Sequence, residues 1–231
     1  MANRTHTLIV LGLLIVLAVL GFIMQRLIPP RIDLPFETTS TVLAAEFASL
    51  PDEIAAVLGT GRTYADPLKM AQYLDFPFIA SYVALFVILG LALRNYDVPA
   101  ARGVAWTSVI CAVAAGIFDV AENVTILRTI ANPVALSSHV RWFSMPKWGL
   151  AFFVMLVESI VFLFWPKLTL WWRLAAVLLG LFFLFVGGAG MLFTLLGSVA
   201  DIGWTADLMA WAMGLLLVFM AAMLVRLRYL R

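Results

Sequence analysis

The stretch "LIVLGLLIVLAVLGFIM", residues 8–24, decides the class of fold because it contains no charged side chain. An α-helix rises about 1.5 Å per residue, so roughly 20 apolar residues cross a hydrocarbon core of about 30 Å. The preceding "MANRTH" is typical of a signal peptide, but the apolar run is long and lacks a clear small-x-small cleavage site. We therefore expect residues 1–28 to form an uncleaved transmembrane helix.

Further apolar segments of similar length follow along the chain. Of its 231 residues, 64% are hydrophobic and 12% are charged, whereas a soluble domain has about 25% charged residues. A backbone in contact with lipid must satisfy its own hydrogen bonds, which favours helices. The sequence therefore predicts an all-α, polytopic transmembrane bundle of about six helices. The apolar segments are 7–28, 77–94, 104–127, 147–165, 170–196 and 206–225.

One longer polar segment, residues 29–76, separates the first two apolar segments. Within it, "STVLAAEFASL" and "LPDEIAAVLG" predict two short helices, the second with Pro51 in its first turn and Gly59 at its end. Its apolar positions are too few for a separate core, so we expect a small helical cap on the membrane surface or over the mouth of the bundle. Residues 77–231 are then expected to supply five helices that complete one membrane domain.

The basic residues indicate an orientation in the membrane. With the N-terminus in the cytoplasm, short inside segments hold Arg94, Arg102 and Arg173, as the positive-inside rule requires. The longer outside segments hold nearly as many bases. We expect a multi-pass protein of the plasma membrane with both termini in the cytoplasm and an extracytoplasmic cap.

The segment "GIFDVAENVTILR", residues 116–128, places charge where a membrane-spanning helix is expected. Asp119, Glu122 and Asn123 are spaced i, i+3 and i+4, so they share one face of a helix. Small residues at 108, 112, 115 and 116 continue that face, and small residues favour close helix contacts in lipid. The three polar side chains are therefore expected to point into the bundle.

A second membrane segment, "MPKWGLAFFVMLVESIVFLFWP", carries Lys147 and Glu158 on one face. They are eleven positions apart, or about 16 Å along a helix axis. If Arg128 and Pro146 mark the outer ends of their helices, Glu158 and Asp119 lie at similar depths. The same counting lets the Lys147 side chain extend toward the acidic residues of the preceding helix.

Two more residues are expected on the same side of the membrane. Asp75 precedes Pro77 and is interpreted first as the N-cap of the second membrane helix, and Tyr82 lies about two turns further in. The candidate ligand-binding residues, all in the half of the bilayer near the cap, are Asp75, Tyr82, Asp119, Glu122, Asn123, Lys147 and Glu158.

Two interpretations of these residues remain open. Buried ionisable groups usually pair with one another and can simply hold helices together. Intramembrane carboxylates also mark water-accessible binding sites, and an excess of acids over bases favours a neutral, amine-bearing or cationic ligand.

Three hypotheses about function follow from these interpretations. The first is a non-enzymatic protein that binds a lipid-like or small amphiphilic or cationic molecule. The second is an accessory subunit of a larger membrane-protein complex, in which the polar residues are structural. The third is an intramembrane isomerase or hydrolase with Asp119 or Glu122 as acid or base.

Other classes of function lack the residues they need. The bases are scattered rather than gathered with aromatic residues, so nucleic acid is not an expected partner. Cys111 is the only cysteine, and His6 and His139 lie outside the expected membrane interior, which leaves thiolate metal sites and bis-histidine haem without ligands. No catalytic motif of soluble enzymes is found, and we assign no cofactor and no metal ligand.

Four stretches, "LPFETTS", "LDFPFIASYVAL", "FDVAENVTILR" and "KWGLAFF", are distributed over about the first two thirds of the chain. This pattern resembles a family of small, uncharacterised bacterial integral membrane proteins. The resemblance implies the polytopic fold, a bacterial origin and the inner membrane. It implies no reaction and no ligand.

Overall fold

The computed structural model describes residues 4–95, 99–132, 139–164 and 168–229, and within them every regular element is a helix. The all-α fold is confirmed, since six of the helices are long and apolar enough to cross a membrane. These six helices are α1 (Arg4–Leu27), α4 (Ala65–Ala92), α5 (Pro99–Ala131), α7 (Val140–Leu163), α8 (Leu170–Leu196) and α9 (Val199–Tyr229).

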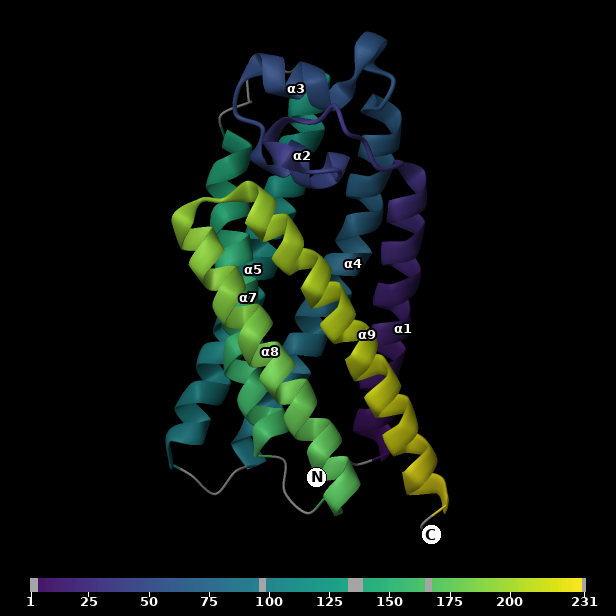
Figure 1. The fold of residues 1–231 in the computed structure, drawn as a ribbon, viewed down its shortest axis with the longest axis vertical. Helices are drawn as coiled ribbons and strands as arrows, with labels where there is room; N and C mark the ends of the chain where they lie inside the picture. The colour runs from purple at the N-terminus through teal and green to yellow at the C-terminus, as the bar shows by residue number, and fades with distance from the viewer. Residues whose placement is uncertain (1–3, 96–98, 133–138, 165–167, 230–231) are drawn as a thin grey trace.

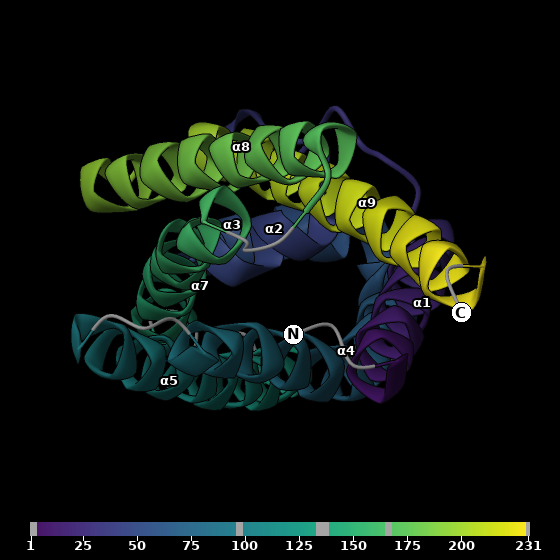
Figure 2. The same ribbon diagram turned by 90° about the horizontal axis from the view of Figure 1, so that it is seen from below.

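The six long helices form a closed ring (Figure 2). Going round it, α1 packs on α4, α4 on α5, α5 on α7, α7 on α8 and α8 on α9, and α9 returns to α1. Consecutive membrane helices are therefore neighbours in space, as short connections favour.

Apolar side chains fill the interior of the ring and also cover its outside. Phe152, Phe183 and Leu85 are fully buried. On the outside, Trp171 and Leu178 are 78% and 67% exposed. Exposed apolar area on this scale is typical of a surface that contacts lipid, so the outer face supports a membrane environment.

The contact between α7 and α8 depends on a glycine. A Cβ atom at Gly187 would lie 2.6 Å from the backbone nitrogen of Leu156 and 2.7 Å from the carbonyl oxygen of Phe152. The two backbones therefore approach more closely than any side chain would permit, which is how small residues hold membrane helices together.

Two short helices, α2 (Thr41–Phe47) and α3 (Pro51–Leu58), form a cap over one end of the ring, and α1 begins and α9 ends at the other end (Figure 1). Single 3₁₀ turns at Pro35–Glu37 and Thr60–Arg62 flank them, and a third at Leu93–Asn95 follows α4. Apolar residues of the cap pack with Ile126 and Ile130 of α5. The cap thus has no core of its own and completes its packing on the bundle.

Arg31 ties the first connection to α3. Its guanidinium donates to the carbonyl oxygens of Val57 (2.8 Å) and Ala56 (3.0 Å), where helix α3 ends. The guanidinium also pairs with Asp33 at 2.7 Å. The hydrogen bonds that Arg31 donates to the Asp33 carboxylate lower the pKa of that group. A cation at a helix C-terminus satisfies carbonyl groups that the helix leaves unpaired.

The second membrane helix begins earlier than the sequence indicated. Helix α4 starts at Ala65 rather than at 77, so residues 65–76 belong to it, and both Asp75 and Pro77 lie inside the helix. The interpretation of Asp75 as an N-cap is therefore wrong. The turns before Pro77 are stabilised by tertiary packing, since Leu68 is buried with the cap residues, and such packing overrides a local start signal.

Candidate functional site

Lys147 lies at the centre of a group of buried carboxylates beneath the cap. Its Nζ atom is 2.8 Å from Glu122 Oε1, 3.1 Å from Glu46 Oε1 and 3.3 Å from Asp119 Oδ1. All four residues are less than a tenth exposed. We call Lys147, Glu46, Asp119 and Glu122 the Lys147 cluster.

Three elements bring the Lys147 cluster together. Asp119 and Glu122 lie about one turn apart on α5, and Lys147 lies about two turns into α7, which packs against α5. Glu46 comes from α2, which rests on α7 and α5. The expected reach of Lys147 to Glu122 is confirmed.

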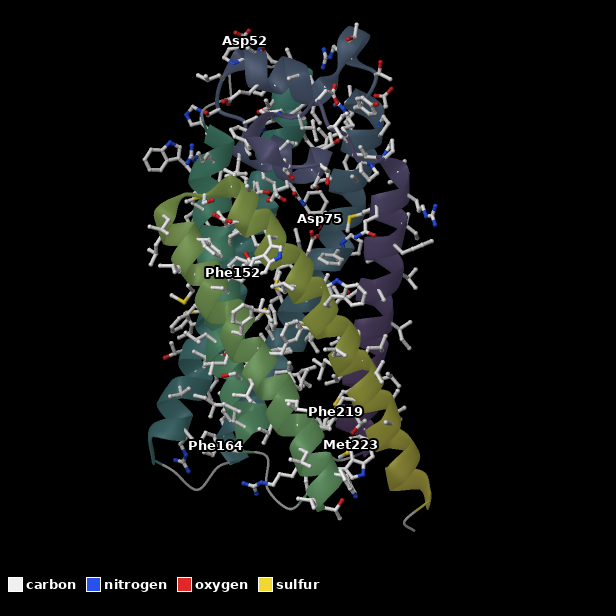
Figure 3. All side chains as sticks on the ribbon, viewed as in Figure 1. Asp52, Asp75, Phe152, Phe164, Phe219 and Met223 are labelled. Atoms are coloured by element: carbon white, nitrogen blue, oxygen red, sulfur yellow. The ribbon has the colours of Figure 1, made fainter. Side chains whose placement is uncertain are left out.

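Neutral donors extend the Lys147 cluster toward α4. The hydroxyl of Tyr82 donates to Asp119 Oδ2 at 2.8 Å, and Nδ2 of Asn123 donates to Asp75 Oδ2 at 2.7 Å. Asp75 and Tyr82 belong to α4, and Asn123 follows Glu122 on α5. Six of the seven candidate residues thus lie in one connected region, with Asp75 visible below α2 in Figure 3.

Glu46 is held from three sides. Nε1 of Trp148 donates to Glu46 Oε2 at 2.8 Å, Lys147 contacts Oε1, and the Ser144 hydroxyl donates to the Glu46 carbonyl oxygen at 2.6 Å. Burial raises the pKa of the Glu46 carboxyl, although the positive charge of Lys147 opposes this shift.

The charges of the region do not balance. Counting Asp75, four carboxyl groups gather about one ammonium group, and Glu122 Oε2 has no hydrogen-bond partner among the described residues. An unpaired buried charge is costly, so such groups take up protons or meet a cation. Among the described residues, the region therefore holds more carboxyl groups than its one ammonium group can neutralise.

Glu158 lies apart from the Lys147 cluster. Its carboxylate accepts a hydrogen bond from Ser108 at 3.2 Å, and Ser108 is eleven positions, or about 16 Å, from Asp119 along α5. The expectation of similar depths for Glu158 and Asp119 is wrong because α7 begins at Val140, before Pro146. That earlier start sets Lys147, rather than Glu158, level with Asp119.

The sequence interpretation missed Glu46 and the role of Trp148. The sequence did contain an indication that Glu46 is buried, because this carboxylate lies within the otherwise apolar stretch "VLAAEF" of α2. Trp148 was assigned no role in the site, yet its ring nitrogen bonds Glu46 and its ring stacks on Phe152. Both residues act across a tertiary contact that spacing along the chain does not show.

A cavity of about 410 Å³ opens beside the Lys147 cluster, between the cap and the first turns of α9. Two acidic residues, Glu46 and Asp207, and two tryptophans, Trp148 and Trp204, are among the residues that line it, and no basic residue does among the described residues. The full lining is Thr38, Thr39, Ser40, Val42, Leu43, Glu46, Trp148, Ala200, Gly203, Trp204, Ala206 and Asp207.

The comparisons with known proteins add no functional evidence. No family model, no curated protein and no solved structure matches the chain. The functional proposal therefore rests on the chemistry of the Lys147 cluster and the cavity beside it.

Proposed function

We propose that the protein is a non-enzymatic membrane protein that binds an amphiphilic organic cation in the cavity between the cap and α9. The observation that carries this proposal is the lining of the cavity, which combines Glu46 and Asp207 with Trp148 and Trp204 and contains no base among the described residues. A volume of about 410 Å³ is within the usual range of about 300 to 1,000 Å³ for small-molecule sites.

Each part of the lining fits one part of such a ligand. Carboxylates attract a positive headgroup, and an indole face binds a cation through the ring quadrupole. Trp148 already has the Lys147 ammonium 5.0 Å from its ring centroid, so Trp204 is the indole left to a ligand. Val42 and Leu43 supply apolar contacts for an alkyl or aryl portion. The charge imbalance of the Lys147 cluster adds a negative field behind Glu46, which disfavours anionic ligands.

The place of the cavity supports the same proposal. It lies at the cap end of the six membrane helices, where a ligand can enter from water or from the lipid headgroup region. The basic residues in the short loops favour the extracytoplasmic side for this end, with both chain termini in the cytoplasm. A bacterial inner membrane is the location that the resemblance implies.

The test uses a pair of probes of matched shape and opposite charge. Tetraphenylphosphonium and tetraphenylborate are titrated into the protein in lipid nanodiscs, with tryptophan fluorescence and calorimetry as readouts. We expect saturable binding of the cation at one site and no saturable binding of the anion. Equal binding of both probes, or of neither, would contradict the proposal.

Two variants connect the binding to the cavity. Glu46→Gln is expected to weaken tetraphenylphosphonium binding about tenfold, which corresponds to about 1.4 kcal/mol, because it removes a carboxylate from the lining. Asp52→Asn is the control, since Asp52 is an exposed carboxylate on α3 outside the cavity. The proposal fails if both variants bind the probe as the unmodified protein does.

The pH dependence of binding gives a second arm of the test. Glu46 attracts a cation only when ionised, and its pKa is raised above that of an ordinary glutamate. Affinity for tetraphenylphosphonium should therefore increase as pH rises through this raised pKa and stay low below it. Tetraphenylphosphonium has a permanent charge, so any such change belongs to the protein.

A structural role in a larger complex is the second candidate function. It is favoured by the three ion pairs of Lys147, which connect α2, α5 and α7 and would stabilise a scaffold. Native mass spectrometry of the gently extracted protein separates the two proposals. A stoichiometric assembly with other chains would favour the accessory subunit, and a single chain with a small bound mass would favour the binding protein.

A further inference from the structure

Glu158 is a buried ionisable residue that the proposed binding site does not use. It is 0% exposed, as is Ser108, the residue that donates to its Oε1 atom. Its second oxygen, Oε2, is buried and has no hydrogen-bond partner among the described residues. Glu158 also takes part in none of the ion pairs found in the described part of the chain.

Helices α4 and α5 meet α7 at this point without supplying a charge. From α5 comes the Ser108 hydroxyl, and from α4 comes Gly90, where an added Cβ would lie 2.8 Å from Ser108 Oγ and 3.6 Å from Glu158 Oε1. The absence of a side chain at Gly90 lets the backbone of α4 close over the Ser108 and Glu158 pair. The pair is thereby enclosed inside the bundle, toward the end away from the cap, since Glu158 lies five residues before α7 ends at Leu163.

An ionised Glu158 would be a poor fit to these surroundings. The Ser108 hydroxyl and the backbone of Gly90 are the polar groups that act on Glu158, and both are neutral. Neutral groups compensate only part of the cost of removing a carboxylate from water, and a buried carboxyl group without a counter-charge takes up a proton instead. A metal cation is no better, because hard cations need about six oxygen ligands and this pair offers the oxygens of two side chains. A proton needs only one oxygen atom, and Oε2 of Glu158 has no other partner among the described residues.

We propose that Glu158 carries a proton and forms, with Ser108, a second intramembrane proton-binding site that is separate from the Lys147 cluster. Along α7 the two sites are eleven residues apart, or about 16 Å. In the protonated state Oε2 holds the proton and Oε1 accepts the Ser108 hydrogen bond. The two sites then lie at different levels of the bundle, the Lys147 cluster beneath the cap and Glu158 toward the opposite end of α7.

Infrared spectroscopy tests this proposal directly, because a protonated carboxyl group has a C=O stretching band that is distinct from the carboxylate bands. Spectra of the protein in nanodiscs at neutral pH are compared with those of Glu158→Gln. We expect the variant to lose one protonated-carboxyl band and no carboxylate intensity. Loss of carboxylate intensity with an unchanged protonated-carboxyl region would overturn the proposal.

Two further variants keep the test informative if Glu158→Gln does not fold. Ser108→Ala keeps the carboxyl group and removes its hydrogen bond, so the Glu158 band should persist and move to higher frequency. Glu122→Gln is the control for the Lys147 cluster and should leave that band in place. The proposal is also overturned if Ser108→Ala leaves every protonated-carboxyl band unmoved.

Discussion

Among the described residues, Lys147 is the one cation in contact with the buried carboxylates Glu46, Asp119 and Glu122. Burying any of these charges alone is unfavourable, and each depends on its partner for compensation. A single ammonium group thus joins helix α2 of the cap to the membrane helices α5 and α7. We expect its loss to weaken the packing of all three helices.

We predict that Lys147→Met destabilises the protein by about 3 to 5 kcal/mol, because it removes one side of a buried charge network and leaves the carboxylates without a counter-charge. Thermal and denaturant unfolding in mild detergent measure the change. Adding Glu122→Gln to Lys147→Met should recover part of the loss, since it removes one of the unpaired charges.

Lys69→Met is the matched control for that prediction. Lys69 pairs with Asp66 at 3.1 Å, but its side chain is 42% exposed, and exposed ion pairs contribute about 0 to 1 kcal/mol. If Lys147→Met were as stable as Lys69→Met, the Lys147 cluster would not be holding the fold together.

The candidate residues could be predicted wherever helix periodicity alone decided the matter. Asp119, Glu122 and Asn123 had to share a face, because positions three and four apart are neighbours on any α-helix. Glu46 could not be predicted in the same way, because its contact with Lys147 joins residues about 100 positions apart.

At the scale of elements, α7 and α8 come into close backbone contact at Gly187. Membrane helices gain no hydrophobic drive from leaving lipid, so they depend on tight packing. The neighbouring Gly188 is on the same helix, yet a Cβ there would meet nothing within 4 Å. The two positions therefore form a natural pair for substitution.

We predict that Gly187→Ala lowers stability by about 1 to 3 kcal/mol, the usual cost of forcing an atom into a packed contact. Gly188→Ala should be neutral or slightly stabilising, because alanine is the better helix former by up to about 1 kcal/mol. Unfolding temperatures of the two variants in detergent decide the matter, and equal values would show that the α7 to α8 contact is looser than described.

The sequence signals located the first residues of the helices least accurately. Pro77 and Pro146 were taken as near the beginnings of helices, and both lie inside helices in the structure. A proline favours the first turn, but the turns preceding Pro77 are held by the cap above them. The shift at Pro146 also moved Glu158 away from Asp119.

At the scale of the whole molecule, an even number of membrane helices places the first and last helix ends on the face opposite the cap (Figure 1). We predict that cysteines introduced at Asp52 in the cap and at Arg102 near the start of α5 are reached from opposite sides of the membrane. Both positions are exposed, and Cys111→Ala removes the native thiol.

An impermeant maleimide applied to right-side-out vesicles should label Asp52→Cys and not Arg102→Cys. The reverse result would keep the six-helix bundle and invert its orientation. Labelling of both positions from one side would contradict the number of membrane spans.

The sequence by itself determined that this protein is a helical membrane bundle with a cap, and that one helix face carries Asp119, Glu122 and Asn123. Those conclusions depend on segment length, apolar content and a period of 3.6 residues, which are local properties. Only the tertiary structure decided that Glu46 and Trp148 join the site, that Glu158 stands apart, and that a cavity lies against α9. These features depend on the relative register of packed helices, where a shift of a few residues moves a side chain by a whole turn.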